Sequence, residues 1–257
     1  MCILFVALNQ HPRYPLIIAA NRDEYHARPS LSMHWWEDRP RIFAGRDLSA
    51  GGTWLGINRD GAFAAVTNFR TGEDHRADGR SRGELAVRYL ESSGTPADFH
   101  GFLRQHHHEY NPFNLVYGDR RGLHTWGYDN PGARALDSGF HSVSNGPMDT
   151  IWPKMSRGVT GLARQIRDHP DIGPETLLPL MLDTTPAPDG DLPGGGPDLE
   201  RERQLSPIYI RGEEYGTRTT TILLFREDGI GISEYEHGPE RPATSANRFH
   251  VPDTATG

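Results

Sequence analysis

Cysteine is almost absent from this sequence: Cys2 is the only one in 257 residues. A single thiol cannot form an intramolecular disulfide, and without a paired CxxC motif there is no zinc ribbon and no dithiol redox site. The sequence therefore excludes a disulfide-stabilised secreted domain, and the position of the lone cysteine near the start of the chain needs an explanation of its own.

Long apolar runs are absent as well. The first run, ILFVAL at 3–8, has no basic stretch before it and is followed by NQHPRYP in place of a small-residue cleavage site, so it does not fit a signal peptide. No run approaches the roughly 20 apolar residues that a membrane helix needs. We expect a soluble, cytoplasmic protein with no membrane insertion.

Charge of one sign is not concentrated in any segment. The formal net charge of −7 is spread without blocks, which gives no electrostatic reason to approach nucleic acid or an anionic membrane. Lysine is nearly missing, since Lys154 is the only one against 26 arginines, and we attribute this bias to genomic base composition. Lys154 lies in no GxxxxGK loop, so nothing indicates nucleotide binding. Neither a nucleic acid nor a membrane partner is expected.

Histidine is plentiful, with 13 residues, but its spacing does not suit a metal. The run HHH at 106–108 lies late in an expected helix, where successive side chains diverge by about 100°, so the three cannot converge on one ion. No pair has the HxxxH spacing that places two ligands on one helical face. We expect a solvated helix end and no metal site.

The order of the expected elements favours an α+β architecture. Apolar runs predict strands at 3–8 and 15–20, and 53–69 predicts a hairpin turning at RDG, which gives four strands in the first 70 residues. Helices are expected from Ser81, with Glu84 at capping-box spacing, and from Thr95. A three-stranded meander, two more helices and a hairpin turning at EDG follow, an order that does not fit βαβ units.

The chain is expected to form one domain. Residues 1–237 show no break in composition and are enough for a substantial core. The segment 184–198, rich in proline and glycine, and the tail 238–257 are expected to be flexible.

Position 2 is unusual for a lone cysteine. The initiator methionine is usually removed when the next residue is small, which would make Cys2 the first residue and place its thiol beside a free α-amine. Because an α-amine has a pKa of about 7.7 to 8 and a thiol one of about 8.5, the amine can accept the thiol proton near neutral pH. This is the arrangement of an N-terminal nucleophile. The alternative is a chance cysteine in a buried strand.

Further motifs favour the nucleophile. NRDE at 21–24 follows the buried-looking strand PLIIAA, at its expected end, and ARPS, GGTWLG, TNFR, SRG, SNG and YGTRTTT come later. Together with MC at the start, this set resembles the NRDE family, also called the transport and Golgi organisation protein 2 family, over 1–236. The resemblance implies a four-layer αββα sandwich of the N-terminal nucleophile hydrolase type.

The motif order is also similar to the cysteine branch of those hydrolases, which includes choloylglycine hydrolases and penicillin V acylases. That resemblance implies a nucleophile at Cys2, an oxyanion-hole donor at Asn68, a second active-site asparagine at Asn145 and an orienting arginine at Arg218. It further implies a catalytic arginine, Arg22, at the end of the second strand. We expect the two arginines to favour the thiolate.

The aspartate of that branch is matched by Asp23, although in the acylases two residues separate it from the arginine, whereas Arg22 and Asp23 are adjacent. Adjacent strand residues point to opposite faces, so both cannot face the nucleophile unless the chain turns, and Glu24 competes for the role. Three residues of the NRDE and GGTWLG motifs are candidates for substrate binding, namely Asn21, Glu24 and Trp54.

Two functions stay open. The first is a cysteine amidohydrolase that cleaves a non-peptide C–N bond of a small acyl amide and requires no cofactor. The second, implied by the resemblance to the NRDE family, is a carrier that traffics haem, or holds a lipid-like ligand, without turnover. Specificity would lie in loops such as 34–47, whose composition selects no ligand.

Overall fold

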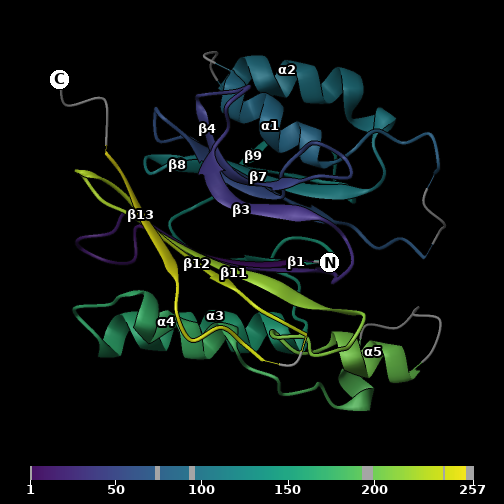
Figure 1. Ribbon diagram of the computed structural model, residues 1–257, viewed down its shortest axis with the longest axis vertical. Coiled ribbons are helices and arrows are strands. Elements are labelled where there is room, and N and C mark those ends of the chain that lie inside the picture. Colours follow the sequence, from purple (N-terminus) through teal and green to yellow (C-terminus); the bar gives the residue numbers. More distant parts are fainter. Residues whose placement is uncertain (1, 73–75, 93–95, 193–198, 240, 253–257) are drawn as a thin grey trace.

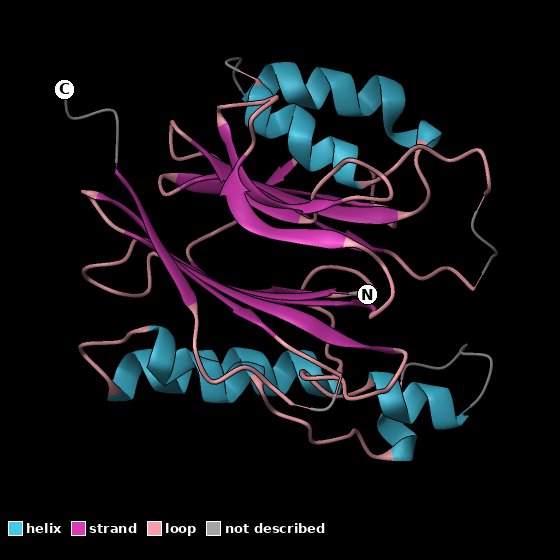
Figure 2. Ribbon diagram, viewed as in Figure 1, coloured by secondary structure: helices cyan, strands magenta, loops and turns pink. Residues whose placement is uncertain are grey.

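The structure, a computed structural model, describes residues 2–72, 76–92, 96–192, 199–239 and 241–252. Two antiparallel sheets lie face to face, and helices cover the outer face of each (Figure 1). The layers follow one another as helix, sheet, sheet, helix, which Figure 2 shows most plainly. The four-layer αββα order expected from the sequence is confirmed.

The first sheet contains the start and the end of the described chain. Each of its neighbouring strands is antiparallel, so consecutive residues of every strand point alternately to the second sheet and to the helices. Its six strands lie in the order β10 (Gly139–Val143), β1 (Cys2–Leu8), β2 (Leu16–Tyr25), β11 (Tyr215–Phe225), β12 (Gly229–Glu236) and β13 (Asn247–Pro252).

The second sheet is a simple meander whose strands follow one another in chain order. Its seven strands are β3 (Ser30–Trp35), β4 (Ile42–Asp47), β5 (Leu55–Asn58), β6 (Phe63–Asn68), β7 (Phe113–Asp119), β8 (Gly122–Gly127) and β9 (Arg134–Ala135).

Each sheet has its own helical cover. Helices α1 (Gly83–Glu91) and α2 (Pro96–His106), followed by the 3-10 turn η1 (His107–Glu109), cover the second sheet. Helices α3 (Pro153–Asp168) and α4 (Pro174–Met181) cover the first, with η2 (Asp189–Asp191) and α5 (Leu199–Leu205) on the same side. Among the described residues, no helix combines the length and apolar character needed to cross a membrane.

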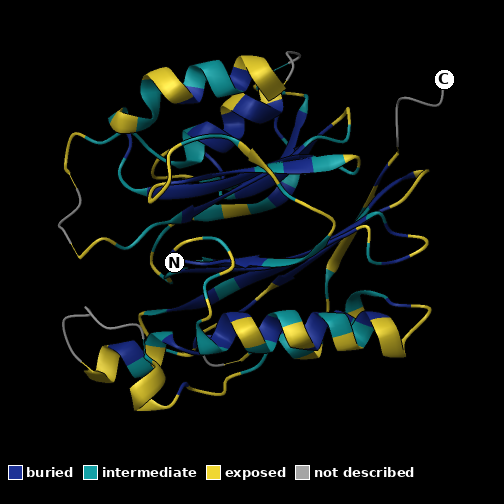
Figure 3. Ribbon diagram, turned by 180° about the vertical axis from the view of Figure 1, so that it is seen from behind, coloured by how far each residue is buried: buried dark blue, intermediate teal, exposed yellow. Residues whose placement is uncertain are grey.

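Three apolar cores hold these layers together, and strand β1 contributes to two of them. Leu4 and Val6 pack between the sheets, whereas Phe5 and Ala7 pack under α3 and α4. Figure 3 shows the dark, buried strands between helices whose outer faces are exposed. The helix-side core is tight, since a Cβ added to Gly158 of α3 would lie 1.9 Å from the ring of Phe5.

Some expected elements differ in the structure. The first 70 residues contain six strands and not four, because β3 and β4 were not expected. The end of β3 and the whole of β4 lie in the segment 34–47, which we assigned to a loop. The expected three-stranded meander is split: β7 and β8 pair, but β10 pairs with β1 in the other sheet, with Leu4 opposite Val143. Helix α1 begins after Arg82, which makes no side-chain cap, so the capping box at Ser81 is not formed.

Parts of the two segments expected to be flexible have regular structure. Residues 247–252 of the tail form β13, which pairs along β12 and extends the first sheet by one strand. Phe249 packs against the inter-sheet core and contacts Phe43 at 5.0 Å between ring centroids, which explains the order of this strand. In 184–198, η2 is described, and 193–198 lie outside the described residues.

Candidate active site

Cys2 lies at the edge of the space between the two sheets. It begins β1, and its partner across the ladder to β2 is Arg22. Alternation along the strand places its side chain on the same face as Leu4 and Val6, toward the second sheet. The hydroxyl of Ser144 donates a hydrogen bond of 3.0 Å to the Cys2 carbonyl oxygen. The residue is thus fixed in place, yet it keeps part of its surface exposed.

The surroundings of Cys2 favour the neutral thiol. Burial raises the pKa of the thiol, and the carboxylate of Asp23 raises it further, while Arg22 and a hydrogen bond from the Asp23 backbone lower it. The net direction is upward, so the arginines do not favour the thiolate strongly enough to produce it at neutral pH. Ionisation of Cys2 therefore needs a base that takes its proton.

Arg22 is a buried cation with an incomplete set of partners. Its side chain is 5% exposed, and its guanidinium lies 4.3 Å from the ring centroid of Trp54. Nη2 is 3.4 Å from an oxygen of Asp47, whereas Nη1 is buried and has no hydrogen-bond partner among the described residues. Such an unmatched donor is costly in a folded protein and is usually found where a ligand completes it.

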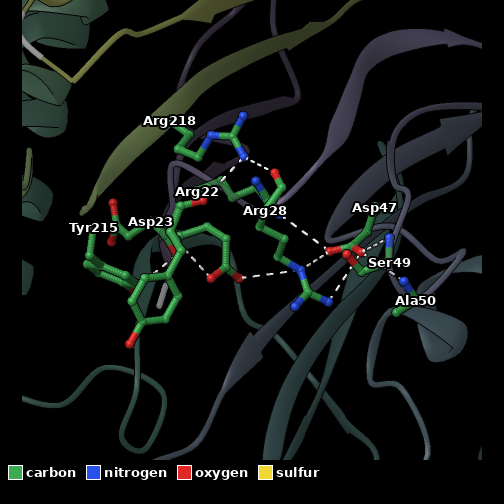
Figure 4. A network of polar contacts seen from close by, with 10 residues as sticks. Arg22, Asp23, Arg28, Asp47, Ser49, Ala50, Tyr215 and Arg218 are labelled. Carbon is green, nitrogen blue, oxygen red and sulfur yellow. Dashed lines mark hydrogen bonds and ion pairs between the residues drawn. The ribbon is translucent and has the colours of Figure 1, made fainter. Parts of the chain in front are cut away.

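Asp47 contacts Arg22, Arg28 and the backbone of the following loop (Figure 4). It accepts hydrogen bonds from Nε and Nη2 of Arg28 at 2.6 and 3.2 Å and from the backbone of Ser49 and Ala50. Although burial raises it, the hydrogen bond from Arg28 brings the pKa of the Asp47 carboxyl below its ordinary value. Asp47 thus remains ionised and pairs mainly with Arg28, and it contributes only weakly to neutralising the neighbouring buried guanidinium.

Arg218, expected to orient the nucleophile or the substrate, comes from β11 and reaches the same rim. It donates hydrogen bonds to the carbonyl oxygens of Tyr25 and Arg28, as Figure 4 shows for Arg28. Burial lowers its pKa, and the neighbouring charge of Arg22 lowers it further. Its hydrogen bonds therefore hold the end of β2 and the chain that follows it, from Tyr25 to Arg28.

Asp23 lies behind the cysteine, on the helix side of the first sheet. It accepts a 2.6 Å hydrogen bond from the Thr217 hydroxyl, and a register shift in β11 between Thr217 and Thr219 lies opposite it. Burial raises the pKa of the Asp23 carboxyl. Strand β2 itself keeps a regular register with β1, so Arg22 and Asp23 point to opposite faces: Arg22 faces the space between the sheets, and Asp23 approaches Cys2 through its backbone.

Lys154 is a site residue that sequence reasoning missed. It lies on α3, is 5% exposed, and donates a 3.0 Å hydrogen bond to the carbonyl oxygen of Leu205. Burial lowers its pKa to about 8, and the charge of Asp23 opposes that change. The single lysine of the chain is therefore the cation that faces Asp23 from the helix layer. The only sign of it in the sequence is that Lys154 is the single lysine of the chain.

Asn68 and Asn145 meet at the other side of the site. Asn68 ends β6 of the second sheet, and its carbonyl oxygen accepts a 2.8 Å hydrogen bond from the amide of Asn145. Within the described ranges the Asn68 side-chain amide makes no hydrogen bond of its own, and both residues line an open cleft of about 1670 Å³ together with Glu24 and Tyr215. Asn68 therefore presents a free N–H donor at the cleft.

Arg82 is a second residue that sequence reasoning left out, although it lies in the SRG motif. It precedes α1 and donates a 3.3 Å hydrogen bond to the carbonyl oxygen of Pro112. Burial lowers the pKa of Arg82.

The three expected substrate contacts have different positions. Asn21 is 1% exposed, and its amide donates hydrogen bonds of 2.9 Å to the carbonyls of Met181 and Ile208, so it joins the sheet to the helix layer and does not reach the cleft. Glu24 lines the cleft. Trp54 lies against Arg22 and positions it.

The histidine run at 106–108 lies at the end of a helix, as the sequence predicts. α2 ends at His106, and His107 and His108 begin η1 and line the cleft. No group of three or more His, Cys, Asp or Glu side chains among the described residues could hold a metal ion.

Comparisons with known proteins concern the fold and the family of the chain. A solved structure of the C2A mutant of conjugated bile acid hydrolase from Clostridium perfringens superposes with a TM-score of 0.56 over 98% of this chain and 92% of that one, at 9% sequence identity, so the likeness is one of fold. The fold is that of the N-terminal nucleophile hydrolases.

Sequence relatives are closer. The Transport and Golgi organization protein 2 homolog of Bos taurus is 30% identical over 275 residues, covering 98% of this chain and 99% of that protein. The homolog of Homo sapiens is 31% identical over 250 residues, covering 89% and 90%. The family model of Transport and Golgi organisation 2 matches residues 1–238, and the chain therefore belongs to that family.

Proposed function

We propose that the protein is an N-terminal nucleophile-type cysteine hydrolase that cleaves a non-peptide C–N bond in a small acyl amide. The observation that carries the proposal is the pairing of a partly exposed Cys2 with the buried Arg22. Hydrogen bonds from Ser144 to the Cys2 carbonyl and to Asn145, and from Asn145 to Asn68, connect this pair to an open cleft that Asn68 lines. The fold shared with a bile acid hydrolase supports the same chemistry.

In this mechanism the Cys2 sulfur attacks the amide carbonyl carbon, and the carbonyl oxygen becomes an oxyanion. Asn68 donates an N–H to that oxygen, and Asn145 holds the Asn68 backbone in place through its 2.8 Å hydrogen bond. A donor of this kind is worth roughly 3 to 4 kcal/mol in transition-state stabilisation. The amine leaves with a proton, and water then hydrolyses the thioester and restores the thiol.

Because the pKa of the Cys2 thiol is raised, the reaction needs a base that takes the thiol proton. Removal of Met1 would give Cys2 a free α-amine, whose ordinary pKa of about 7.7 to 8 suits proton transfer from a thiol near neutral pH. In this proposal Asp23 and Lys154 set the charge behind that amine. The α-amine of Cys2 therefore takes the thiol proton in the first step and then gives that proton to the amine that leaves.

The test combines the mass of the mature chain with turnover of a panel of N-acyl amides. The proposal expects a chain that begins at Cys2, hydrolyses at least one amide, and loses that activity in Cys2→Ala while its unfolding free energy changes by less than about 1 kcal/mol. Equal turnover by wild type and Cys2→Ala refutes the nucleophile. A retained Met1 with no turnover favours the alternative.

That alternative is a non-catalytic carrier of haem or of a lipid-like ligand. The observation in its favour is the cleft, whose large volume and wall of Trp126, Tyr128, His107 and His108 suit a flat apolar molecule with a polar edge. Haem titration of wild type, Cys2→Ala, His107→Ala and His108→Ala decides the point. A saturable Soret shift that one substitution removes establishes a carrier with a defined axial ligand.

A further inference from the structure

Three aromatic rings lie together on the outer face of the second sheet, under helix α2. Tyr117 of β7 and His124 of β8 are direct partners across the ladder, so their side chains point to the same face. His100 of α2 packs against both of them. The ring centroids of His100 and His124 are 4.9 Å apart, and each lies 5.7 Å from that of Tyr117. The three rings thus form a compact triangle between the helix and the sheet.

Each of these rings carries a buried polar atom that has no hydrogen-bond partner among the described residues. The atoms are Nε2 of His100, Nδ1 of His124 and the hydroxyl oxygen of Tyr117. They make up three of the seven buried side-chain nitrogen and oxygen atoms in this condition in the part of the chain that the structure describes. Leaving such an atom unsatisfied is costly, so three of them on adjoining rings point to one shared partner.

The two histidines do not satisfy each other, although they are in contact. A neutral imidazole has one N–H and one free lone pair, so an N–H···N hydrogen bond between the rings is chemically available. Their buried nitrogens make no such bond. Burial lowers the pKa of both histidines, although the charge of Asp119 opposes this for His124. Both rings therefore stay neutral at neutral pH, and neutral imidazole is the form of histidine that binds metal ions.

The spacing of the two imidazoles suits a shared metal ion. A histidine nitrogen binds Zn²⁺ at about 2.0 to 2.1 Å, which puts two ring centres at a tetrahedral angle roughly 5 Å apart. The observed separation of the His100 and His124 centroids is 4.9 Å. Imidazole ligands select zinc, copper and nickel, whereas Mg²⁺ and Ca²⁺ prefer oxygen ligands.

We propose that His100, His124 and Tyr117 form a binding site for one divalent transition-metal ion of the zinc and copper class, between α2 and the second sheet. The two imidazoles are the main ligands, and the Tyr117 oxygen is the third. Both histidines are partly exposed, so water reaches the site and completes the coordination. The ion would tie α2 to β8. The site lies in a different layer from Cys2 and does not depend on the proposed hydrolase function.

The ligand set predicts a moderate affinity. Among the described residues no third His, Cys, Asp or Glu side chain is placed to join the two histidines. A structural zinc site commonly has four such ligands, so this site should bind its ion more weakly than a zinc finger does.

The test measures binding of Zn²⁺ and Cu²⁺ to the full chain without an affinity tag, by equilibrium dialysis and by the shift in thermal unfolding midpoint. Wild type should bind one ion with a Kd in the micromolar range, and its midpoint should rise with the ion concentration. Mg²⁺ should bind at least about tenfold more weakly. Binding of Mg²⁺ as tight as that of Zn²⁺, or no binding of either transition ion, overturns the site.

Three variants test the ligands. His100→Gln and His124→Gln should each weaken Zn²⁺ binding by at least about tenfold and abolish the rise in midpoint, because each removes one of the two imidazoles. Tyr117→Phe keeps the ring and removes only the oxygen, so it should weaken binding about fivefold. Each variant is compared with its own ion-free protein, so that a general loss of stability does not imitate the result.

His108→Gln is the matched control. His108 is exposed and lies in the histidine run that follows α2, which is the competing place for adventitious metal binding. This variant should bind Zn²⁺ within about twofold of wild type. Equal losses in His108→Gln and His100→Gln assign the ion to the run and overturn the site, as does unchanged binding in His100→Gln or His124→Gln. Unchanged binding in Tyr117→Phe overturns the third ligand.

Discussion

Replacing Lys154 by methionine tests whether this lysine balances the charge of Asp23. Both residues lie between the first sheet and α3, and they are 5% and 2% exposed. Methionine keeps nearly the same length, so the packing loss is small, but the cation and the hydrogen bond to Leu205 disappear. Removing one charge of a buried pair costs about 3 to 5 kcal/mol, and we expect a loss of about 3 kcal/mol in unfolding free energy at pH 7.

The pH dependence gives the sharper result. Burial already raises the pKa of Asp23, and losing the lysine raises it further. A group with a raised pKa stabilises the fold below its unfolded pKa, and that contribution is lost as pH rises through the folded pKa. The deficit of Lys154→Met should therefore be smaller at pH 5 than at pH 7.

The assay is urea denaturation followed by tryptophan fluorescence at both pH values. Asp23→Asn added to Lys154→Met should recover at least half of the deficit at pH 7, because the uncompensated charge is gone. Asp23→Asn alone is the control. A deficit that is equal at the two pH values, or that the double variant retains in full, refutes the charge balance and leaves Lys154 with a packing role.

Three further predictions concern other parts of the fold. Burial raises the pKa of Glu234 to about 7, so wild type should lose about 3 kcal/mol of stability as pH rises from about 4.5 through 7, and Glu234→Gln should remove that slope in urea titrations. Gly158→Ala should lower the unfolding free energy by about 3 kcal/mol, since its Cβ meets the Phe5 ring, and an unchanged denaturation midpoint would contradict this. Asn145→Ala should reduce kcat/KM for an amide substrate about 100-fold through Asn68 and change the unfolding free energy by about 1 kcal/mol.

Elements with a local signal were predictable from the sequence. The hairpin of β5 and β6 turns where RDG supplies Gly61 with a φ of 79°, and β11 and β12 turn where EDG supplies Gly229 with a φ of 143°. A glycine between two strand-like runs, where the chain needs a positive φ, predicts the turn. The place of β10 has no local signal, because it depends on pairing with β1, far away in the chain.

Some residues of the candidate site also have a signal in the sequence, and others do not. Cys2, Arg22, Asn68 and Asn145 were found from motifs, and the structure brings the first two together on one ladder and the last two into one hydrogen bond. Lys154 was missed because its chemistry arises only from burial opposite a strand more than a hundred residues earlier.

The raised pKa of Cys2 and the unmatched donors of Arg22 have one explanation. If the arginine served mainly to hold a thiolate, the thiol pKa would lie below its ordinary value, yet burial outweighs the arginine and the pKa is raised. The resting site therefore contains a neutral thiol next to a buried cation that is only weakly compensated by Asp47. Such an arrangement is unfavourable until a negative group arrives, because a buried charge needs a partner. The group that completes it must come with the substrate or form during the reaction. An anion that arrives with the substrate and the thiolate of Cys2 would compete for the same guanidinium, so such a bound anion should delay thiolate formation until the base acts.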